Sequence, residues 1–300
     1  MRVLMDDHPL DVTIEQEETL SEVLAGVSEF LTANGMILTA LSVDNERLEL
    51  DSLSEWGSRS IAAVDEIRLS TQPQWELILT HLHLVGGFVH AWREALASEN
   101  GQAVRRLAEE QSDLARHFEE HVGLIFTDLP DGALANLFSV TGDAALMADP
   151  PSGKRALLAE MDQIVPLIEQ RIAEIQTPER VAAAVAGLIT SLIPQVQEVS
   201  ILLQTGKDAD AMSLVVRFTE LTEKLFRTLP HLARAHDGFR KQYLDGERVP
   251  ALIASLNERL HELVDAFGAQ DSVLIGDLLE YEIVPRIAEL IAVLPGDTGA

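Results

Sequence analysis

Histidine and glutamate side chains at helical spacing are the residues of this chain best suited to chemistry. His90 and Glu94 are four residues apart, as are His117 and His121, so each pair shares one face of a helix. His83 lies two turns before His90. Imidazole and carboxylate groups at this spacing bind transition metals such as iron, manganese or zinc. These five residues therefore form a candidate metal site.

The five candidate ligands fall on two consecutive expected helices. If the chain turns at Asn100–Gly101, the helices run antiparallel and His83 lies level with His117. This seam resembles hemerythrin-like and other di-metal helical bundles, in which ligands from facing helices point inward. It departs from the hemerythrin pattern because the expected helix over 154–176 carries no His and Asp pair. The simpler interpretation is that these imidazoles lie at ordinary helical positions and hydrogen-bond to nearby carboxylates.

Composition excludes several other functions. The 300 residues include no Cys, so the chain can form no disulfide, thiolate metal site or catalytic thiol. With 49 acidic and 22 basic residues the formal charge is −27, which disfavours binding to nucleic acid and to anionic lipid. No Gly-x-Ser-x-Gly motif or comparable catalytic frame is present. We therefore assign no catalytic residue and no cofactor, and an enzyme is the less favoured class.

The sequence carries no sign of membrane insertion or export. No segment approaches the roughly 20 consecutive apolar residues that span a bilayer, and the first residues lack the apolar core of a signal peptide. The hydrophobic fraction of 47% is enough to bury a core in each of two domains. We expect a folded cytoplasmic protein.

Alternating apolar residues predict strands in the first 71 residues. A capping box at Thr19–Glu22 predicts the start of a helix, and Asn34–Gly35 predicts its end. Asp44–Asn45 predicts a tight turn. The apolar runs that we interpret as strands cover about residues 1–5, 10–14, 36–43, 48–50 and 67–69. The predicted order of elements is therefore ββαβββ.

This order, with these lengths, resembles the β-grasp fold of ubiquitin-like proteins. The segment Ser52–Trp56 is similar to the Thr-Leu-Ser-Asp-Tyr segment that leads into the last strand of ubiquitin. Ubiquitin and the sulfur-carrier members end in an exposed Gly-Gly, whereas here the last strand continues into Ser70–Gln74. The resemblance therefore implies a small docking module that performs neither conjugation nor sulfur transfer.

From Trp75 onward the pattern is helical. We predict the α+β class: an N-terminal ubiquitin-like β-grasp domain followed by one or two all-α antiparallel helical bundles. The expected domains are 1–71, 75–177 and 178–300. A long loop is expected over 128–153, where Pro and Gly are frequent. The expected helices cover about residues 76–97, 102–126, 154–176, 178–204, 208–229, 250–267 and 271–294.

The two helical halves share a short pattern. Residues 164–168 and 283–287 both read Ile-Val-Pro-x-Ile. This leaves two interpretations open: an internal duplication, or Pro residues that kink unrelated helices.

Two functions from different classes remain. The leading interpretation is a non-enzymatic scaffold or adaptor that binds another protein, because the expected head is a docking module and the acidic surface would attract a partner with a basic surface. The alternative is a helical bundle that binds a transition metal through the His and Glu seam. A homo-oligomer is compatible with either function.

Overall fold

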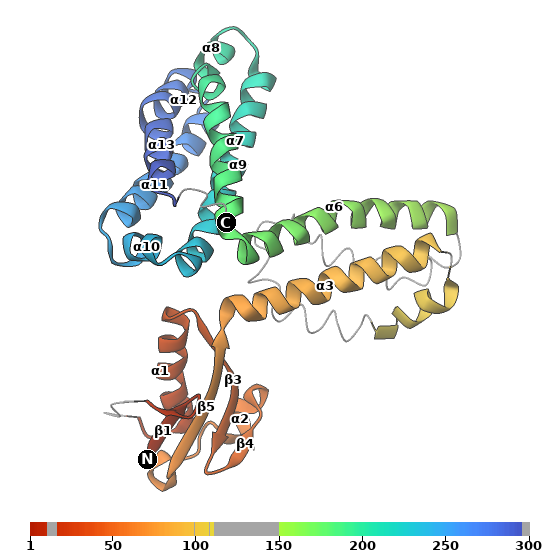
Figure 1. The fold of residues 1–300 in the computed structure, drawn as a ribbon, viewed down its shortest axis with the longest axis vertical. Coiled ribbons are helices and arrows are strands. Elements are labelled where there is room, and N and C mark those ends of the chain that lie inside the picture. Colours follow the sequence, from red (N-terminus) through yellow and green to blue (C-terminus); the bar gives the residue numbers. More distant parts are fainter. Residues whose placement is uncertain (11–16, 99, 108, 111–149, 296–300) are drawn as a thin grey trace. The chain divides into compact units, whose positions relative to one another are not determined.

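A computed structural model describes residues 1–10, 17–98, 100–107, 109–110 and 150–295 (Figure 1). The chain divides into two compact units, Met1–Ile168 and Glu169–Ala300. The first unit contains a five-stranded sheet followed by helices, and the second contains helices among its described residues. The predicted α+β class is confirmed.

The N-terminal sheet is mixed and carries one long helix. We call residues 1–73 the head. Strand β1 is parallel to β5, whereas the β1–β2, β3–β4 and β3–β5 pairs are antiparallel. The order across the sheet is β2-β1-β5-β3-β4. The elements are β1 Arg2–Met5, β2 His8–Pro9, α1 Leu20–Ala33, β3 Met36–Val43, β4 Glu46–Leu48, α2 Leu53–Trp56 and β5 Glu66–Pro73. This arrangement is compatible with the β-grasp-like fold that we expected.

Period-two alternation decides which side chains the head buries. Ile67 on β5 is paired with Val3 on one side and with Val43 on the other. Paired residues point to the same face of a sheet, so the side chains of Val3, Ile67 and Val43 lie on one face. The residues two positions away along each strand point to that face as well. The helix α1 packs its apolar stripe on this face. The core of the head comprises Val3, Leu20, Val23, Val27, Leu31, Leu41, Val43, Leu48, Trp56, Ile67 and Leu69.

Local signals in the sequence set the ends of these elements. The carboxylate of Glu22 accepts hydrogen bonds from the backbone N–H groups of Glu18 (2.7 Å) and Thr19 (3.0 Å), as the capping box requires. These bonds hold the pKa of Glu22 below its usual value. Asp44 and Asn45 have positive φ values of 51° and 70°, which fit a two-residue hairpin turn. The predicted capping box and turn are therefore confirmed.

Two long helices follow the sheet, and the second of them begins in the first unit and ends in the second. They are α3, Gln74–Ala97, and α6, Pro150–Gln176. Arg93 on α3 forms an ion pair with Asp162 on α6 at 2.8 Å, so the helices lie side by side (Figure 1). The loop expected over 128–153 is wrong at its end, because residues 150–153 already belong to α6. Residues 101–107 and 109–110 of the helix expected over 102–126 are helical, and the remainder lies outside the described residues.

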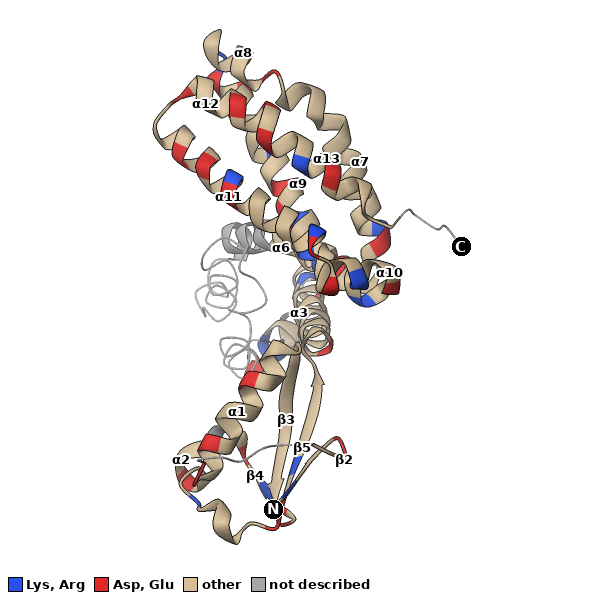
Figure 2. Ribbon diagram, turned by 90° about the vertical axis from the view of Figure 1, so that its left-hand side faces the viewer, with Lys and Arg blue, Asp and Glu red and all other residues tan. Residues whose placement is uncertain are grey.

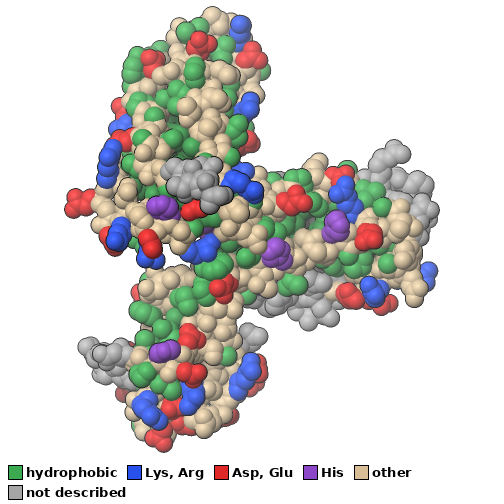
Figure 3. Space-filling view, in the orientation of Figure 1, with side chains coloured by type: hydrophobic (Ala, Val, Ile, Leu, Met, Phe, Trp, Pro, Cys, Tyr) green, Lys and Arg blue, Asp and Glu red, His purple; other side chains and the backbone are tan. Residues whose placement is uncertain are grey.

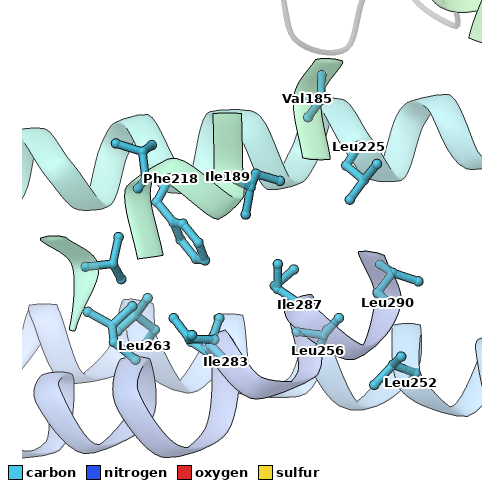
Figure 4. Packing of buried hydrophobic residues seen from close by; sticks show 14 of the residues in the cluster. Val185, Ile189, Phe218, Leu225, Leu252, Leu256, Leu263, Ile283, Ile287 and Leu290 are labelled. Atoms are coloured by element: carbon cyan, nitrogen blue, oxygen red, sulfur yellow. The ribbon is translucent and has the colours of Figure 1, made fainter. Parts of the chain in front are cut away.

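The second unit packs helices in two layers. In Figure 4, Ile189 on α7 and Phe218 on α9 point toward Ile283 and Ile287 of the opposite layer. The bounds are α7 Pro178–Val196, α8 Val199–Gln204, α9 Asp208–Ala235, α10 Asp237–Arg240, α11 Arg248–Gly268, α12 Ser272–Asp277 and α13 Val284–Ala292. The labelled core residues are Val185, Ile189, Phe218, Leu225, Leu252, Leu256, Leu263, Ile283, Ile287 and Leu290.

Proline positions explain two differences from the expected helices. The helix expected to end at Leu229 continues through Pro230 to Ala235, since the buried Leu232 and Ala233 carry the apolar face beyond the proline. The helix expected over 271–294 contains a π-helical segment at Leu278–Ile283. Pro285 follows this segment and has no N–H to donate to the preceding turn, so the hydrogen-bond spacing widens there.

One glycine allows two short helices to approach closely. A Cβ atom added to Gly276 on α12 would lie 2.5 Å from the Cβ atom of Ser200. Real Cβ atoms do not come this close, so the contact between α8 and α12 requires glycine.

Among the described helices, none is both long enough and apolar enough to cross a bilayer.

The Phe218 side chain is fully buried at the centre of the second unit, so Phe218→Ala should leave a cavity. We expect the free energy of unfolding to fall by about 3 to 5 kcal/mol in urea denaturation. Met212→Ala is the matched control, since Met212 lies on the same helix and is 46% exposed. It should change the free energy by less than about 0.5 kcal/mol. Equal losses in the two variants would contradict the packing described here.

Candidate functional site

The predicted metal seam falls partly within the described residues. His83, His90 and Glu94 lie on α3, and all three are exposed. Their spacing of seven and four residues places them on one face of the helix. Figure 3 shows His side chains at the surface over the α3 and α6 hairpin. His117 and His121 lie outside the described residues.

The side chains of α3 divide into an exposed stripe and a buried one. His81, Val85, Val89 and Trp92 belong to the buried stripe, and His81 is 3% exposed. Phe88 and Trp92 pack edge to face, with ring centroids 6.3 Å apart. Within the ranges that the structure describes, no group of three or more His, Asp or Glu residues is placed to hold a metal ion. The five-residue seam therefore stays a prediction.

The head presents a sheet face that α1 does not cover, and we call it the open face. Arg68 on β5 is paired with Leu4 on β1 and with Ser42 on β3. Ser42 is paired in turn with Arg47 on β4. These four residues therefore form one row across the sheet and point away from α1. The next row places Arg2 of β1 beside Glu66 of β5.

Glu66 holds two of the arginines of the open face. It forms ion pairs with Arg2 at 3.0 Å and with Arg68 at 2.6 Å, and Arg68 also approaches Asp7 at 3.6 Å. The side chain of Glu66 is 14% exposed, whereas those of Arg2 and Arg68 are 78% and 48% exposed. The carboxylate of Glu66 keeps the pKa of Arg68 above its usual value. Glu66 thus holds both guanidinium groups in place, and both remain accessible to solvent.

The charges of the head are unevenly distributed. Residues 1–73 contain fifteen acidic and four basic residues. Three of the four basic residues, Arg2, Arg47 and Arg68, lie on the open face. In Figure 2 the strands carry blue segments, whereas α1 carries red ones. The open face is therefore a basic area on an acidic module.

A buried ionic cluster joins α6 to α9 in the second unit. Glu174 is 2% exposed, and its carboxylate accepts hydrogen bonds from Arg171 (2.7 Å), Gln170 (3.2 Å) and Arg227 (3.4 Å). Arg234 donates a hydrogen bond of 2.6 Å to the backbone oxygen of Ile175. The last turns of α6 are therefore attached to α9 by charge-assisted bonds.

Burial and charge shift the titration of this cluster. Burial raises the pKa of Glu174, and the guanidinium of Arg171 opposes that shift. Burial also lowers the pKa of His231 to about 4, with further contributions from the positive charges of Arg234 and Arg171. His231 is therefore neutral at pH 7. This cluster is not evident from the sequence, because Arg227 lies 53 residues from Glu174 along the chain.

A shallow hollow of about 450 Å³ lies between α11 and α13. Leu252 and Pro285 form part of its apolar lining. Arg248 crosses it to Glu289 at 2.6 Å, and Arg286 donates to the hydroxyl oxygen of Ser255 at 2.9 Å. Each guanidinium is thus already bonded within the bundle, so these contacts fasten the two helices together.

His231 should make stability depend on pH. Its pKa of about 4 in the folded chain lies below the ordinary value of 6.5, so the unfolded chain binds a proton that the folded chain excludes. This contribution is fully present above about pH 6.5 and is lost as the pH falls toward 4. Between about pH 8 and about pH 5, the wild type should lose about 2 kcal/mol more than His231→Gln in urea denaturation.

His261→Gln is the control for this measurement, since it removes an exposed imidazole from α11. Its stability should follow the wild type across the same pH range. If the free energy of unfolding depended on pH in the same way for the wild type and His231→Gln, the assignment of a neutral, half-buried imidazole would be wrong.

Two family models match separate parts of the chain. Residues 1–73 match the TP0873 N-terminal domain, and residues 181–292 match a domain of unknown function, DUF8042. Neither description is that of a ubiquitin-like family. The first match ends with strand β5, and the second lies within the second compact unit.

One relative has 27% identity over 115 residues, and it is an uncharacterized protein of Treponema pallidum (strain Nichols). The alignment covers 37% of this chain and 56% of the relative, so the chain spans about half the length of the relative that it matches. No solved structure matches. The comparisons thus place similarity in the head and in the second unit, and assign no activity to either.

Proposed function

We propose that this chain is a non-enzymatic cytoplasmic adaptor that binds another protein through the open face of its head. The observation that carries this proposal is the one-sided burial of the sheet. Helix α1 covers one face, while the opposite face carries the exposed side chains of Arg2, Arg47 and Arg68. An ordered sheet surface that faces solvent suits recognition of a partner protein.

We assign the head to the β-grasp fold. The support is the strand order β2-β1-β5-β3-β4, with a parallel central pair and the helix α1 between β2 and β3. Strand β5 ends at Pro73 and α3 begins at Gln74. The head therefore offers no free carboxyl terminus after its last strand, which favours docking over group transfer.

The helical residues that follow the head in the chain would serve as the scaffold. We retain the division into 1–71, 75–177 and 178–300 as the proposed domains. The net charge of −27 would attract partners with basic surfaces over long range. In the second unit, ion pairs fasten helices to one another, as Glu174 of α6 does with Arg227 of α9, which suits a structural role.

The docking surface can be tested by blocking it without changing its charge. Ser42→Tyr with Ser70→Tyr adds two rings to the open face, because Ser42 is paired with Arg68 and Ser70 lies two residues after Arg68 on β5. The full chain, immobilised and exposed to an extract of its native cells, should retain a partner in a saturable way. The blocked variant should lose this partner at least tenfold.

Ser28→Tyr is the matched control, since Ser28 is exposed on the outer side of α1. It should retain the partner at the wild-type level. Circular dichroism and thermal unfolding should be the same for all three proteins. Equal recovery by the wild type and the blocked variant would remove the open face from the proposal.

Metal binding is a second candidate function. The observation in its favour is the shared exposed face of His83, His90 and Glu94 on α3, which leaves these groups accessible to an ion. We propose that His117 and His121 complete this seam. The ion would be iron, manganese or zinc, because imidazole and carboxylate ligands suit all three.

The metal proposal predicts about one or two metal equivalents per chain by elemental analysis of protein purified without chelator. His117→Gln with His121→Gln should reduce this content and lower the thermal unfolding temperature, because bound metal stabilises the folded state. His261→Gln should retain the metal. Zero metal in the wild type after incubation with all three ions would eliminate the seam.

A further inference from the structure

We propose that the open face of the head selects an acidic segment of the partner protein, whose carboxylates bind Arg47 and Arg68, with Arg2 as a third cation. This inference rests on the proposed adaptor function and adds the chemistry of the partner. It differs from the expectation drawn from the net charge, because the open face is a local exception to the acidic surface.

The register of the sheet fixes the spacing between these cations. Arg68 and Arg47 belong to the same row, and Ser42 of β3 lies between them. Neighbouring strands are about 4.8 Å apart, so the two arginines originate about 10 Å from each other. An extended chain advances about 3.3 Å per residue and alternates its side chains between two faces, so carboxylates at positions i and i+2 or i and i+4 of a partner, about 7 or 13 Å apart, would face the two arginines together. Ser42 is small enough to leave the path between the two arginines open.

The cations of the open face are available for a partner. Arg47 is exposed, and its side chain forms no ion pair or hydrogen bond with any described residue. Arg2 and Arg68 share the largely covered Glu66, and Arg68 also pairs with Asp7 at 3.6 Å, so two carboxylates balance these two guanidinium groups and Arg47 is the cation in excess. Planar guanidinium groups bind carboxylates in a bidentate manner. The face therefore has more positive charge than its own acidic groups neutralise.

The remainder of the head favours the same choice of partner. Fifteen acidic residues lie in residues 1–73, and Glu22 and Glu29 are exposed on α1 behind the sheet. An acidic segment would be repelled there and attracted to the row of arginines, which orients its approach. A basic segment would meet like charge on the open face. Charge thus selects both the ligand and the face to which it binds.

A random-peptide display library is the probe for this proposal. The full chain should enrich peptides rich in Asp and Glu, with a preference for acidic residues two or four positions apart. Arg47→Gln with Arg68→Gln should reduce this enrichment at least tenfold. Arg59→Gln is the matched control, because Arg59 is 45% exposed and pairs with Glu46 at 2.7 Å away from the strand rows of the open face. It should enrich the same peptides as the wild type.

Each other outcome has a distinct meaning. The enriched peptides could bind the wild type but not the tyrosine-blocked variant, and yet lack acidic residues. That result would overturn this inference and leave the adaptor function standing. Enrichment that is the same with and without the tyrosine block would count against both proposals. A single-stranded oligonucleotide that binds more tightly than the selected peptides, and depends on Arg47 and Arg68, would overturn the acidic-peptide assignment.

Discussion

The packing of α1 on one face of the sheet is the constraint on which the rest of the head depends. Leu20, Val23, Val27 and Leu31 form the buried stripe of this helix. Because side chains alternate with a period of two, a strand that buries Ile67 and Leu69 must present Arg68 on the opposite face. A register shift of one residue would bury the guanidinium and expose the core. A single packing requirement therefore creates both the hydrophobic core and the row of arginines.

Much of this architecture was predictable because its signals are local. The capping box at Thr19–Glu22 and the Asp44–Asn45 turn each involve residues within one turn of the chain. The α3 helix was expected over 76–97 and occupies Gln74–Ala97. The same logic placed His83, His90 and Glu94 on one face of α3, since that inference needs only helical periodicity.

The remaining features depend on contacts that the sequence does not encode locally. Glu174 and Arg227 are 53 residues apart, and their contact requires α6 and α9 to be packed together. Arg47 and Arg68 belong to the same row only because both of their strands pair with β3 at Ser42. Helix periodicity alone also misses the π-helical segment before Pro285, because a change of hydrogen-bond spacing leaves the apolar pattern nearly intact.

The irregularity in β3 has a consequence for how the head meets other chains. Strand β3 extends from Met36 to Val43, but β4 pairs only with Leu41–Val43, so no described strand pairs with that side of β3 over 36–40. The register shift between Leu38 and Ala40 falls within this stretch, where Thr39 donates from its hydroxyl to the backbone oxygen of Ser70. A bulge bends and twists an exposed edge, which makes it a poor template for an added strand. This stretch of β3 is therefore a poor site for edge-to-edge pairing with another chain.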